Sequence, residues 1–428
     1  MSIESTLEYI HKTSWLGSKP GLSRTHELLE KLGNPHKKLK FVHIAGTNGK
    51  GSTCAYIASV LAQAGYKTGL YTSPYINFFN ERIRINGKCI SDDDLEKLVD
   101  VIRPFADSMQ DSPTEFEIIT ALAMKYFCDK ECDIVVLEVG MGGELDSTNV
   151  IDTPECAVIT PIALDHTAVL GDTIEKVAFA KSGIIKGGRV VCADTHGSAY
   201  DVINSVCKVK NASIICPDYS AIKNLVCDIT GSSFDYKEYK QLKIQLTGTY
   251  QPNNAIVALT ALEALRDKGY NISSEDIYTG FENTCWMGRF EILGKSPVFV
   301  LDGAHNPHGM KAAFESLNTL FPGKRIVFVV GAMADKDIST MFSIITPISD
   351  VFYTVTPENS RSMKADKLAE LLCKLGANAV SFDNRFDEVV KAALEKAGKD
   401  GIVAALGSLY FSNDIRKAYE RAVKQINA

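Results

Sequence analysis

The sequence lacks the marks of a membrane protein, a nucleic-acid-binding protein and a disulfide-framed secreted protein. No apolar run approaches the ~20 residues needed to cross a bilayer, and no signal peptide is recognisable. The formal net charge of -6 supplies no global positive field for nucleic acid. The eleven cysteines are scattered, and none forms a Cys-x-x-Cys pair. We therefore expect a cytoplasmic protein with reduced thiols that binds neither a membrane nor nucleic acid.

The chain also lacks the standard P-loop pattern, because Ile44 stands where that pattern has its first glycine and Gly51 stands where it has Ser or Thr. An apolar strand nevertheless leads into a glycine-rich segment with one lysine, and an amphipathic pattern follows it. The segment, which we call the phosphate loop, consists of Gly46, Thr47, Asn48, Gly49, Lys50, Gly51 and Ser52. Its glycines let backbone N–H groups approach an anion, and Lys50 and the helix N-terminus add positive charge. Without a hydroxyl directly after Lys50, part of a magnesium site must come from elsewhere.

The order of apolar strands and helical patterns predicts an α/β protein with two domains. Short strands are expected at 41–45, 67–71, 134–139, 157–160 and 190–193, and residues 211–247 alternate as in a small antiparallel patch. A second series of strands and helices begins at Val298, after the turn-rich segment 294–297. We expect a P-loop-type, mostly parallel sheet domain over residues 1–295. A smaller Rossmann-like α/β domain is expected over residues 296–428.

Polar residues follow the predicted strands of the first domain, where open α/β sheets bind their ligands. Ser73, Glu138 and His166 come after the second, third and fourth strands, and the first two are suitable oxygen ligands for Mg²⁺. The residue pattern leaves open that Ser73 is an ordinary turn residue and His166 a capping or core histidine. Lys181, among small apolar residues, either extends to solvent or has a function.

A second polar cluster opens the second domain. Asp302 and His305 follow a strand, and Arg289, a natural clamp for phosphate or carboxylate, precedes the domain boundary. Capping of a helix that begins near Pro307 would also explain Asp302 and His305. A clamp and a strand-end cluster on both sides of a linker favour a site to which two domains contribute.

Taken together, these motifs resemble the folylpolyglutamate synthase and dihydrofolate synthase family of the Mur ligase superfamily. The motifs that carry the resemblance are residues 46–52, 72–74, 79–83, 138–149, 165–166, 181–186, 251–255, 288–291, 302–307 and 407–410. They span nearly the whole chain in the family's order. One departure is Met287, where the family usually has proline.

The resemblance implies an ATP-dependent ligase that joins L-glutamate to a folate or dihydropteroate carboxylate through an acyl phosphate, releasing ADP and phosphate. The implied catalytic residues are Lys50, His166, Lys181, Asp302 and His305. The implied nucleotide contacts are the phosphate loop, Asn254, Arg289 and Asp302. The implied ligands of two Mg²⁺ ions are Ser73 and Glu138 for one, His166 for the second, and Lys181 in carbamylated form. The implied substrate contacts are His305 and Ser408 for glutamate, and residues 18–20, Phe116, Leu145, Asp146 and Ser147 for the pterin.

Two other functions stay open at this point. One is a Mur-type ligase that acts on a cell-wall precursor, and the other is an ATP-binding regulatory protein without ligase chemistry. The sequence does not decide between dihydropteroate and folylpolyglutamates as acceptor. Small molecules are the only partners expected, and we expect a monomer.

Overall fold

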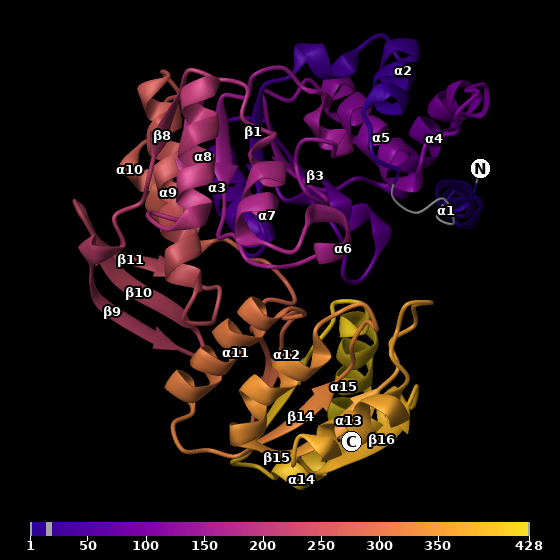
Figure 1. Cartoon of the computed structure of the whole chain (residues 1–428), viewed down its shortest axis with the longest axis vertical. Coiled ribbons are helices and arrows are strands. Elements are labelled where there is room, and N and C mark those ends of the chain that lie inside the picture. The colour runs from indigo at the N-terminus through magenta and orange to yellow at the C-terminus, as the bar shows by residue number, and fades with distance from the viewer. Residues whose placement is uncertain (1, 14–18, 427–428) are drawn as a thin grey trace. The chain divides into compact units, whose positions relative to one another are not determined.

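The computed structural model describes residues 2–13 and 19–426 (Figure 1). Contacts within the chain define two compact units, which we call the N-terminal unit (Met1–Ser220 with Asn253–Thr284) and the C-terminal unit (Ala221–Pro252 with Cys285–Ala428). Each unit is therefore made of two separate stretches of the chain. The boundary predicted between residues 295 and 296 falls between two strands that pair in one sheet. Strand pairing outweighs the turn-forming composition on which that boundary was based.

A mostly parallel sheet forms the centre of the N-terminal unit. Within the described residues it has eight strands in the order β4-β3-β2-β5-β1-β6-β7-β8. Their bounds are β1 Phe41–Ala45, β2 Thr68–Tyr71, β3 Ile83–Ile85, β4 Lys88–Cys89, β5 Ile134–Glu138, β6 Cys156–Ile159, β7 Gly188–Cys192 and β8 Ala212–Ile215. Only the β2–β3 and β3–β4 pairs among these strands are antiparallel. β1 and β5 are buried throughout, as expected for parallel strands that are covered on both faces.

Helices cover both faces of this sheet. They are α1 Ile3–His11, α2 Ser23–Lys31, α3 Lys50–Gln63, α4 Asp92–Asp107, α5 Glu115–Asp129, α6 Thr167–Leu170, α7 Ile174–Ser182, α8 Ser198–Val209, α9 Gln251–Asp267 and α10 Ser274–Glu282, with short 3-10 turns η2 Pro35–Lys38, η3 Phe79–Arg82, η4 Ser147–Val150 and η5 Tyr219–Ala221. Local signals set several helix starts. Thr114 accepts from the Glu117 N–H while the Glu117 carboxylate accepts from the Thr114 N–H, which forms a capping box at α5.

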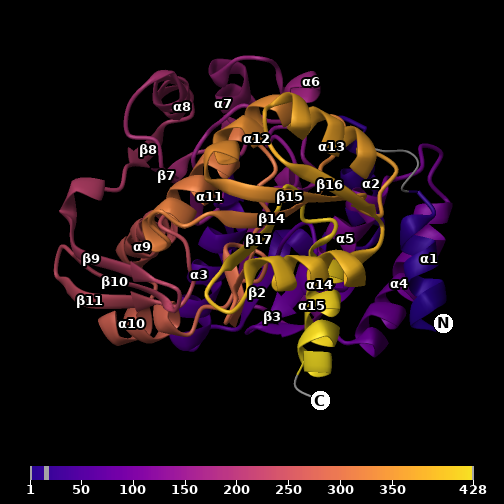
Figure 2. The ribbon, with the colours of Figure 1, turned by 90° about the horizontal axis from the view of Figure 1, so that it is seen from below.

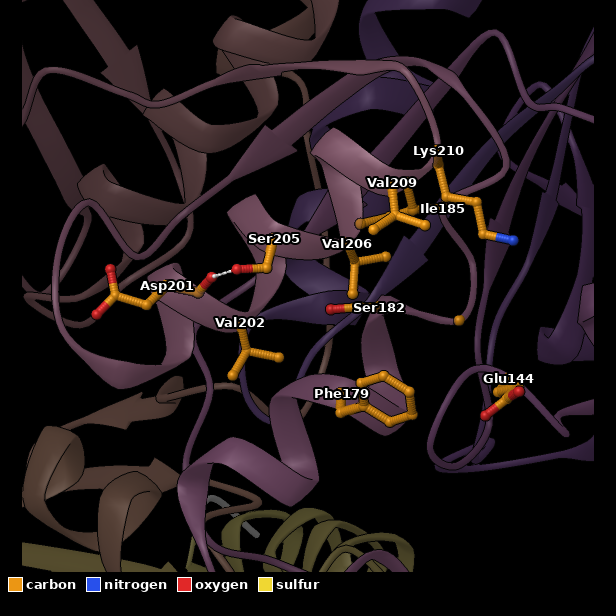
Figure 3. A pocket seen from close by; sticks show the side chains of 11 residues that line it. Glu144, Phe179, Ser182, Ile185, Asp201, Val202, Ser205, Val206, Val209 and Lys210 are labelled. Atoms are coloured by element: carbon orange, nitrogen blue, oxygen red, sulfur yellow. Dashed lines mark hydrogen bonds between the residues drawn. The ribbon is translucent and has the colours of Figure 1, made fainter.

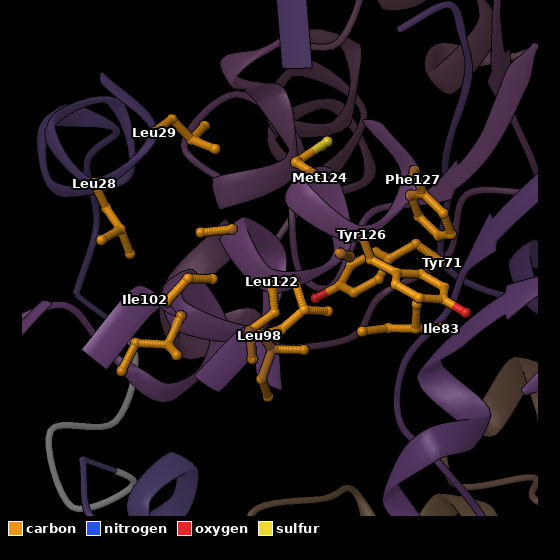
Figure 4. Close-up of a cluster of buried hydrophobic side chains, with 14 of the residues drawn as sticks. Leu28, Leu29, Tyr71, Ile83, Leu98, Ile102, Leu122, Met124, Tyr126 and Phe127 are labelled. Carbon is orange, nitrogen blue, oxygen red and sulfur yellow. The ribbon is translucent and has the colours of Figure 1, made fainter. Parts of the chain in front are cut away.

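The core of the N-terminal unit joins these helices to the strands. Leu28 of α2, Leu98 and Ile102 of α4, and Leu122 of α5 pack with Ile83 of β3 in one apolar cluster (Figure 4). A second cluster joins α7 and α8 to β6 and β7. The sheet edge that carries the predicted site is therefore supported by packed helices.

The antiparallel patch predicted within residues 211–247 is present as a three-stranded sheet. Its strands are β9 Ile222–Asp228, β10 Gly231–Tyr236 and β11 Tyr239–Ile244, in the order β11-β10-β9. The prediction was wrong for Ser213–Ile215, because β8 pairs parallel with β7. β8 lies at the edge of the large sheet, where a short strand with one exposed side alternates like an antiparallel strand.

The C-terminal unit contains a six-stranded sheet in the order β12-β13-β17-β14-β15-β16 within the described residues. Its elements are β12 Glu291–Lys295, β13 Val298–Leu301, α11 Pro307–Leu320, β14 Ile326–Val330, α12 Ile338–Ile345, η6 Thr346–Ile348, β15 Ser349–Val355, α13 Ala365–Lys374, β16 Ala379–Asp383, α14 Phe386–Ala397, β17 Ile402–Leu406 and α15 Ser412–Ile426. All neighbours are parallel except β12 and β13. Figure 2 shows α11, α12 and α13 on one face and α14 and α15 on the other, and two apolar clusters fill these two interfaces.

None of the helices in the described chain is both long and apolar enough to cross a membrane.

Candidate active site

The phosphate loop connects β1 to α3 in a tight turn that requires glycine at two positions. A Cβ on Gly46, whose φ is +148°, would lie 1.8 Å from Oγ1 of Thr160. Gly49 is the N-cap of α3 with φ +84°. Because a glycine cap has no side chain, the first N–H groups of α3, which have no acceptor within the helix, are not covered by their cap residue. This is the backbone arrangement that binds an anion at a helix N-terminus.

The loop is braced by the segment that follows β6. The Thr47 N–H donates to the Pro161 carbonyl oxygen at 3.0 Å. The Thr47 hydroxyl donates to the Ala163 carbonyl at 2.9 Å and accepts from the Ala163 N–H at 3.0 Å. Thr47 is therefore engaged in fixing the loop, which leaves the first turn of α3 as the main source of anion donors.

Two lysines converge on one carbonyl oxygen of the loop. Nζ of Lys50 lies 3.2 Å from the Gly46 oxygen, and Nζ of Lys181 lies 2.8 Å from the same oxygen. Lys181 is only 5% exposed, and this burial, with a further contribution from the charge of Lys50, lowers its pKa to about 7. Two amines beside a helix N-terminus make this point strongly attractive to a polyanion.

Ser73 and Glu138 meet at the same edge of the sheet, as the sequence predicts. The Ser73 N–H donates to Oε2 of Glu138 at 2.9 Å, and Glu138 is buried. In the β1–β5 register, Glu138 lies opposite Ile44, and Ile44 is two residues before the phosphate loop. A hydroxyl and a carboxylate here fit Mg²⁺, which takes its other ligands from phosphate oxygens and water.

His166 lies at the N-cap position of α6 in a left-handed conformation, with φ 50°, and its side chain does not cap the helix. Its Nε2 is 3.9 Å from Oδ1 of Asp165, and the imidazole is 38% exposed. No cluster of three or more His, Cys, Asp or Glu side chains suited to a metal occurs within residues 2–13 and 19–426. Ser73 and Glu138 are therefore in contact, but His166 does not form a preassembled metal site with them.

Two of the residues assigned to the pterin, Phe116 and Asp146, lie beside Gly140 after β5, and a third, Leu145, is 54% exposed. A Cβ on Gly140 would lie 2.5 Å from the Phe116 ring and 3.2 Å from Oδ2 of Asp146. Asp146 is buried and accepts from the Met141 and Thr148 N–H groups, at 2.8 and 3.0 Å. Both of its oxygens thus hold the turn before η4.

Ser147 of the pterin set and Asn254, which is assigned to the nucleotide, also have defined surroundings. The Ser147 hydroxyl lies 2.9 Å from the Thr120 hydroxyl. Asn254 is beside the phosphate loop, since a Cβ on Gly49 would lie 2.6 Å from its Oδ1. Ser18, at the start of the predicted pterin segment 18–20, lies outside the described residues.

In the C-terminal unit, Asp302 is a buried carboxylate at the end of β13. Its Oδ2 accepts from the Phe290 N–H at 2.6 Å and from the Tyr250 hydroxyl at 3.0 Å. Its Oδ1 accepts from the Ala304 N–H at 2.7 Å. These bonds tie the segment after β13 to the turn that carries Arg289.

Asn306 caps α11, because its side chain accepts from the Gly309 N–H at 2.8 Å. Helix capping therefore does not explain His305. The carbonyl oxygen of Gly303 lies 2.7 Å from Nδ1 of His305, so Nδ1 carries the proton and Nε2 holds the lone pair of the neutral ring.

Arg289 and Ser408 lie close to the same strand ends. A Cβ on Gly303 would lie 2.3 Å from Nη1 of Arg289 and 2.2 Å from Leu409. Ser408 is buried, and its hydroxyl accepts from the Tyr410 N–H at 3.1 Å. Arg289, Asp302, His305 and Ser408 together form what we call the C-terminal cluster.

Some residues that support the site belong to no sequence motif and were not predicted. Arg416 forms two bonds to Glu291, at 2.9 and 2.6 Å, and Glu291 accepts from the Gly288 N–H at 2.8 Å. No local signal marks Arg416, which is 125 residues from its partner. Pro161 was detectable in principle, because it follows a predicted strand.

A separate apolar cavity of about 640 Å³ lies between α7 and α8 (Figure 3). Phe179, Val202 and Val206 line it, as do Ser182 and Gly183, which follow Lys181 in the chain. None of the residues predicted to contact ATP, metal, folate or glutamate lines this cavity. The predicted chemistry is thus not located in this cavity.

Comparison with known proteins agrees with this geometry. Residues 44–262 match the Mur ligase middle domain, and residues 288–409 match the Mur ligase, glutamate ligase domain. Together these two domains define a Mur-type ligase. The chain is 38% identical to a dihydrofolate synthase/folylpolyglutamate synthase of Bacillus subtilis, across 96% of this chain and 97% of the relative. It is 34% identical to a folylpolyglutamate synthase of Lacticaseibacillus casei, across 97% and 98%.

Solved structures give the same result. Mycobacterium tuberculosis folylpolyglutamate synthase, complexed with ADP and AMPPCP, superposes with a TM-score of 0.90 at 27% identity, covering 97% of this chain and 98% of that one. Escherichia coli FolC in complex with DHPP and ADP gives 0.86 at 30%, covering 100% and 98%. The chain belongs to the folylpolyglutamate synthase/dihydrofolate synthase family of the Mur ligase superfamily.

Proposed function

We propose that this protein uses ATP to join L-glutamate to the carboxylate of a folate or dihydropteroate, through an acyl phosphate. The observation that carries the proposal is the convergence of Lys50 and Lys181 on the Gly46 oxygen at the N-terminus of α3. Such a site suits the phosphates of ATP, and membership of this family supplies the acceptor class. Family membership also favours folate over a cell-wall precursor, and ligase chemistry over regulatory ATP binding.

In the first step, the acceptor carboxylate attacks the γ-phosphorus of ATP and ADP leaves. Two anions must meet, so the loop has to neutralise charge on the transferring group. Lys50 and the first N–H groups of α3 fit that role. Mg²⁺, when bound, would supply further neutralisation, with Ser73 and Glu138 as ligands of one ion and His166 as a ligand of a second.

We assign Lys181 a role as a carbamate. Its lowered pKa leaves a substantial fraction of neutral amine near pH 7. The Nζ lone pair attacks the carbon of CO₂, one proton leaves to solvent, and the product is an anionic carbamate. That anion would replace the repulsion between Lys181 and Lys50 by attraction, and it would offer oxygen ligands to a metal. Activity should fall in CO₂-free buffer and recover with bicarbonate, and Lys181→Ala should be partly rescued by short carboxylates.

In the second step, the glutamate amine attacks the acyl carbon and phosphate leaves. We assign Asn254, Arg289 and Asp302 to the nucleotide. His305 and Ser408 are assigned to glutamate, since the Nδ1–H of His305 donates to the Gly303 carbonyl and Nε2 is then the nitrogen that can accept an amine N–H. Phe116, Leu145, Asp146 and Ser147 are assigned to the pterin. We further infer a monomer that works in the cytoplasm, which size-exclusion chromatography with light scattering and cell fractionation test.

The deciding experiment measures ADP release by the purified protein with glutamate and one acceptor at a time. Dihydropteroate, a reduced folate with one glutamate and a UDP-linked muramyl peptide are the three acceptors. Turnover with either of the first two supports the proposal and also settles the acceptor. Turnover only with the muramyl peptide, or ATP binding without acceptor-dependent turnover, overturns it.

A further inference from the structure

Two cysteines lie side by side at the edge of the large sheet, away from the predicted motifs. Cys192 is the last residue of β7, and Cys216 directly follows β8. In the parallel register Val191 lies opposite Ile215, so the next pair is Cys192 opposite Cys216, on the same face. Neighbouring strands are ~4.8 Å apart. Disulfide-bonded cysteines usually have Cα atoms ~4.4–6.8 Å apart, so the backbone spacing suits a bridge.

The two sulfur atoms also share one acceptor. Sγ of Cys192 is 3.1 Å from the Asp194 carbonyl oxygen, and Sγ of Cys216 is 3.9 Å from the same oxygen. Both side chains therefore point into the same small space beyond the strand ends. Both thiols are free in this structure, and so are those of the other cysteines in the described chain.

The two thiols differ in a way that assigns their chemical roles. Cys216 is partly exposed, whereas Cys192 is fully buried. When Cys216 ionises, the Cys192 S–H can turn from the Asp194 carbonyl to the Cys216 thiolate. This contact lowers the pKa of Cys216 and, together with burial, raises the pKa of Cys192. Cys216 is thus the more accessible and more readily ionised thiol, which is the combination required of an attacking cysteine.

We propose that Cys192 and Cys216 form a reversible disulfide by exchange with a low-molecular-weight disulfide. The Cys216 thiolate attacks one sulfur of the reagent, and the first reagent thiolate leaves. Cys192 then loses its proton and attacks Cys216 Sγ of the mixed disulfide, and the second reagent thiolate leaves. Two protein thiols are oxidised, and the reagent disulfide is reduced to two thiols.

The bridge has a physical connection to the phosphate loop. Asp194, whose carbonyl faces both thiols, also accepts from the Ile162 N–H through its Oδ2 at 3.1 Å. Pro161, the preceding residue, holds the Thr47 N–H at 3.0 Å. Oxidation removes both S–H groups from the Asp194 carbonyl, so we expect the loop's brace to shift and nucleotide affinity to fall several-fold.

The test treats the full-length protein with oxidised glutathione and maps tryptic peptides without reduction. The bridge should join peptide 190–208 to peptide 211–223, and dithiothreitol should separate them. The first peptide also contains Cys207 of α8, which is close enough to Cys216 for their charges to interact. Cys207→Ser is therefore the matched control and should keep the cross-link. Cys192→Ser and Cys216→Ser should lose it, with circular dichroism to show that both remain folded.

Two results would overturn the disulfide. One is a cross-link that persists in Cys192→Ser and vanishes in Cys207→Ser. The other is full glutathionylation of the exposed thiols Cys285 and Cys373 with no cross-link in the wild type. ADP affinity, measured by calorimetry, tests the connection to the loop. The dissociation constant should rise on oxidation in the wild type and in Cys207→Ser, but not in Cys216→Ser. An unchanged constant in a fully cross-linked protein would overturn the connection alone.

Discussion

At the scale of single residues, the least usual feature is the pair of lysines on the Gly46 carbonyl. Like charges held together oppose each other, and burial adds to the cost of ionising Lys181. Carbamylation of Lys181 would turn this repulsion into attraction, and Lys50 would then act on an arriving phosphate in a site from which water is partly excluded. The arrangement is unfavourable for the free protein and favourable for the complex with a nucleotide.

Lys50→Ala should therefore lower kcat strongly. Loss of one preorganised charge beside a transferring group typically costs roughly 100–1000-fold in kcat. Lys176→Ala is a matched control, because Lys176 is 61% exposed and forms a surface ion pair with Asp172, four residues earlier. Steady-state ADP release measures both variants. Equal kcat values in Lys50→Ala and Lys176→Ala would exclude a role for Lys50 in phosphoryl transfer.

Lys181 should also make stability depend on pH. Its pKa falls from the ordinary 10.5 to about 7 on folding, so between these values the unfolded chain binds the extra proton. Stability must then rise with pH across that window, by up to about 1.4 kcal/mol per pH unit from this group, and the gain is absent below pH 7. Urea unfolding in CO₂-free buffer at pH 7 to 9 measures the slope. In Lys181→Met, the rise of the unfolding free energy with pH should be smaller than in the wild type by this amount. Equal slopes in the two proteins would contradict the lowered pKa.

At the scale of elements, the N-termini of α3 and α11 differ in how their first N–H groups are satisfied. α3 begins at a glycine that caps nothing, whereas α11 begins at Asn306, whose side chain satisfies the Gly309 N–H. The first terminus is left for a ligand and the second is closed by the protein itself.

This difference predicts opposite effects for two adjacent residues. Asn306→Ala should lower stability by about 1 kcal/mol through loss of a cap, and Asn306→Asp should restore it. His305→Ala should leave stability and ATP binding nearly unchanged, but should raise the KM for glutamate and lower kcat. Urea unfolding and glutamate kinetics on all three variants provide the comparison. A stability loss in His305→Ala with an unchanged KM would return His305 to a structural role.

The same scale shows what the sequence can predict. β1 was predicted with its observed bounds because a mainly apolar run ended by glycine is a local signal. The meeting of Ser73 and Glu138 followed from parallel topology, since strand carboxyl ends share an edge. The Arg416–Glu291 pair and the brace from Pro161 depend on contacts between distant segments. Such contacts leave no periodic pattern in the sequence, and neither does the pairing of β8 with the large sheet.

At the scale of the whole molecule, each unit has its own apolar core. Phe328 stacks on Phe352 in the C-terminal unit, with ring centroids 5.1 Å apart, and Leu122 is buried in the N-terminal unit. Two cores without shared residues favour two separate unfolding transitions.

Substitutions in the two cores should therefore shift different transitions in a calorimetric scan. Phe328→Ala should cost about 3–5 kcal/mol and lower the transition of the C-terminal unit alone, and Leu122→Ala should cost about 2–5 kcal/mol in the N-terminal unit. Each variant is the control for the other. A single transition that both variants lower equally would show that the units unfold together.

The interleaving of the two units along the chain also affects how the protein is made. Closing the N-terminal unit requires α10, where the Gly280 carbonyl accepts from the Ser59 hydroxyl of α3 at 2.7 Å. Synthesis from β1 to Thr284 covers roughly 240 residues, which takes about 12–50 s at ~5–20 residues per second. The antiparallel strands β9–β11 leave the ribosome during this interval, before the rest of their own unit exists. Neither unit can therefore complete its fold until a later segment of the chain has been synthesised. We expect the nascent chain to need chaperone protection for longer than a nascent chain of the same length whose domains follow each other without interruption.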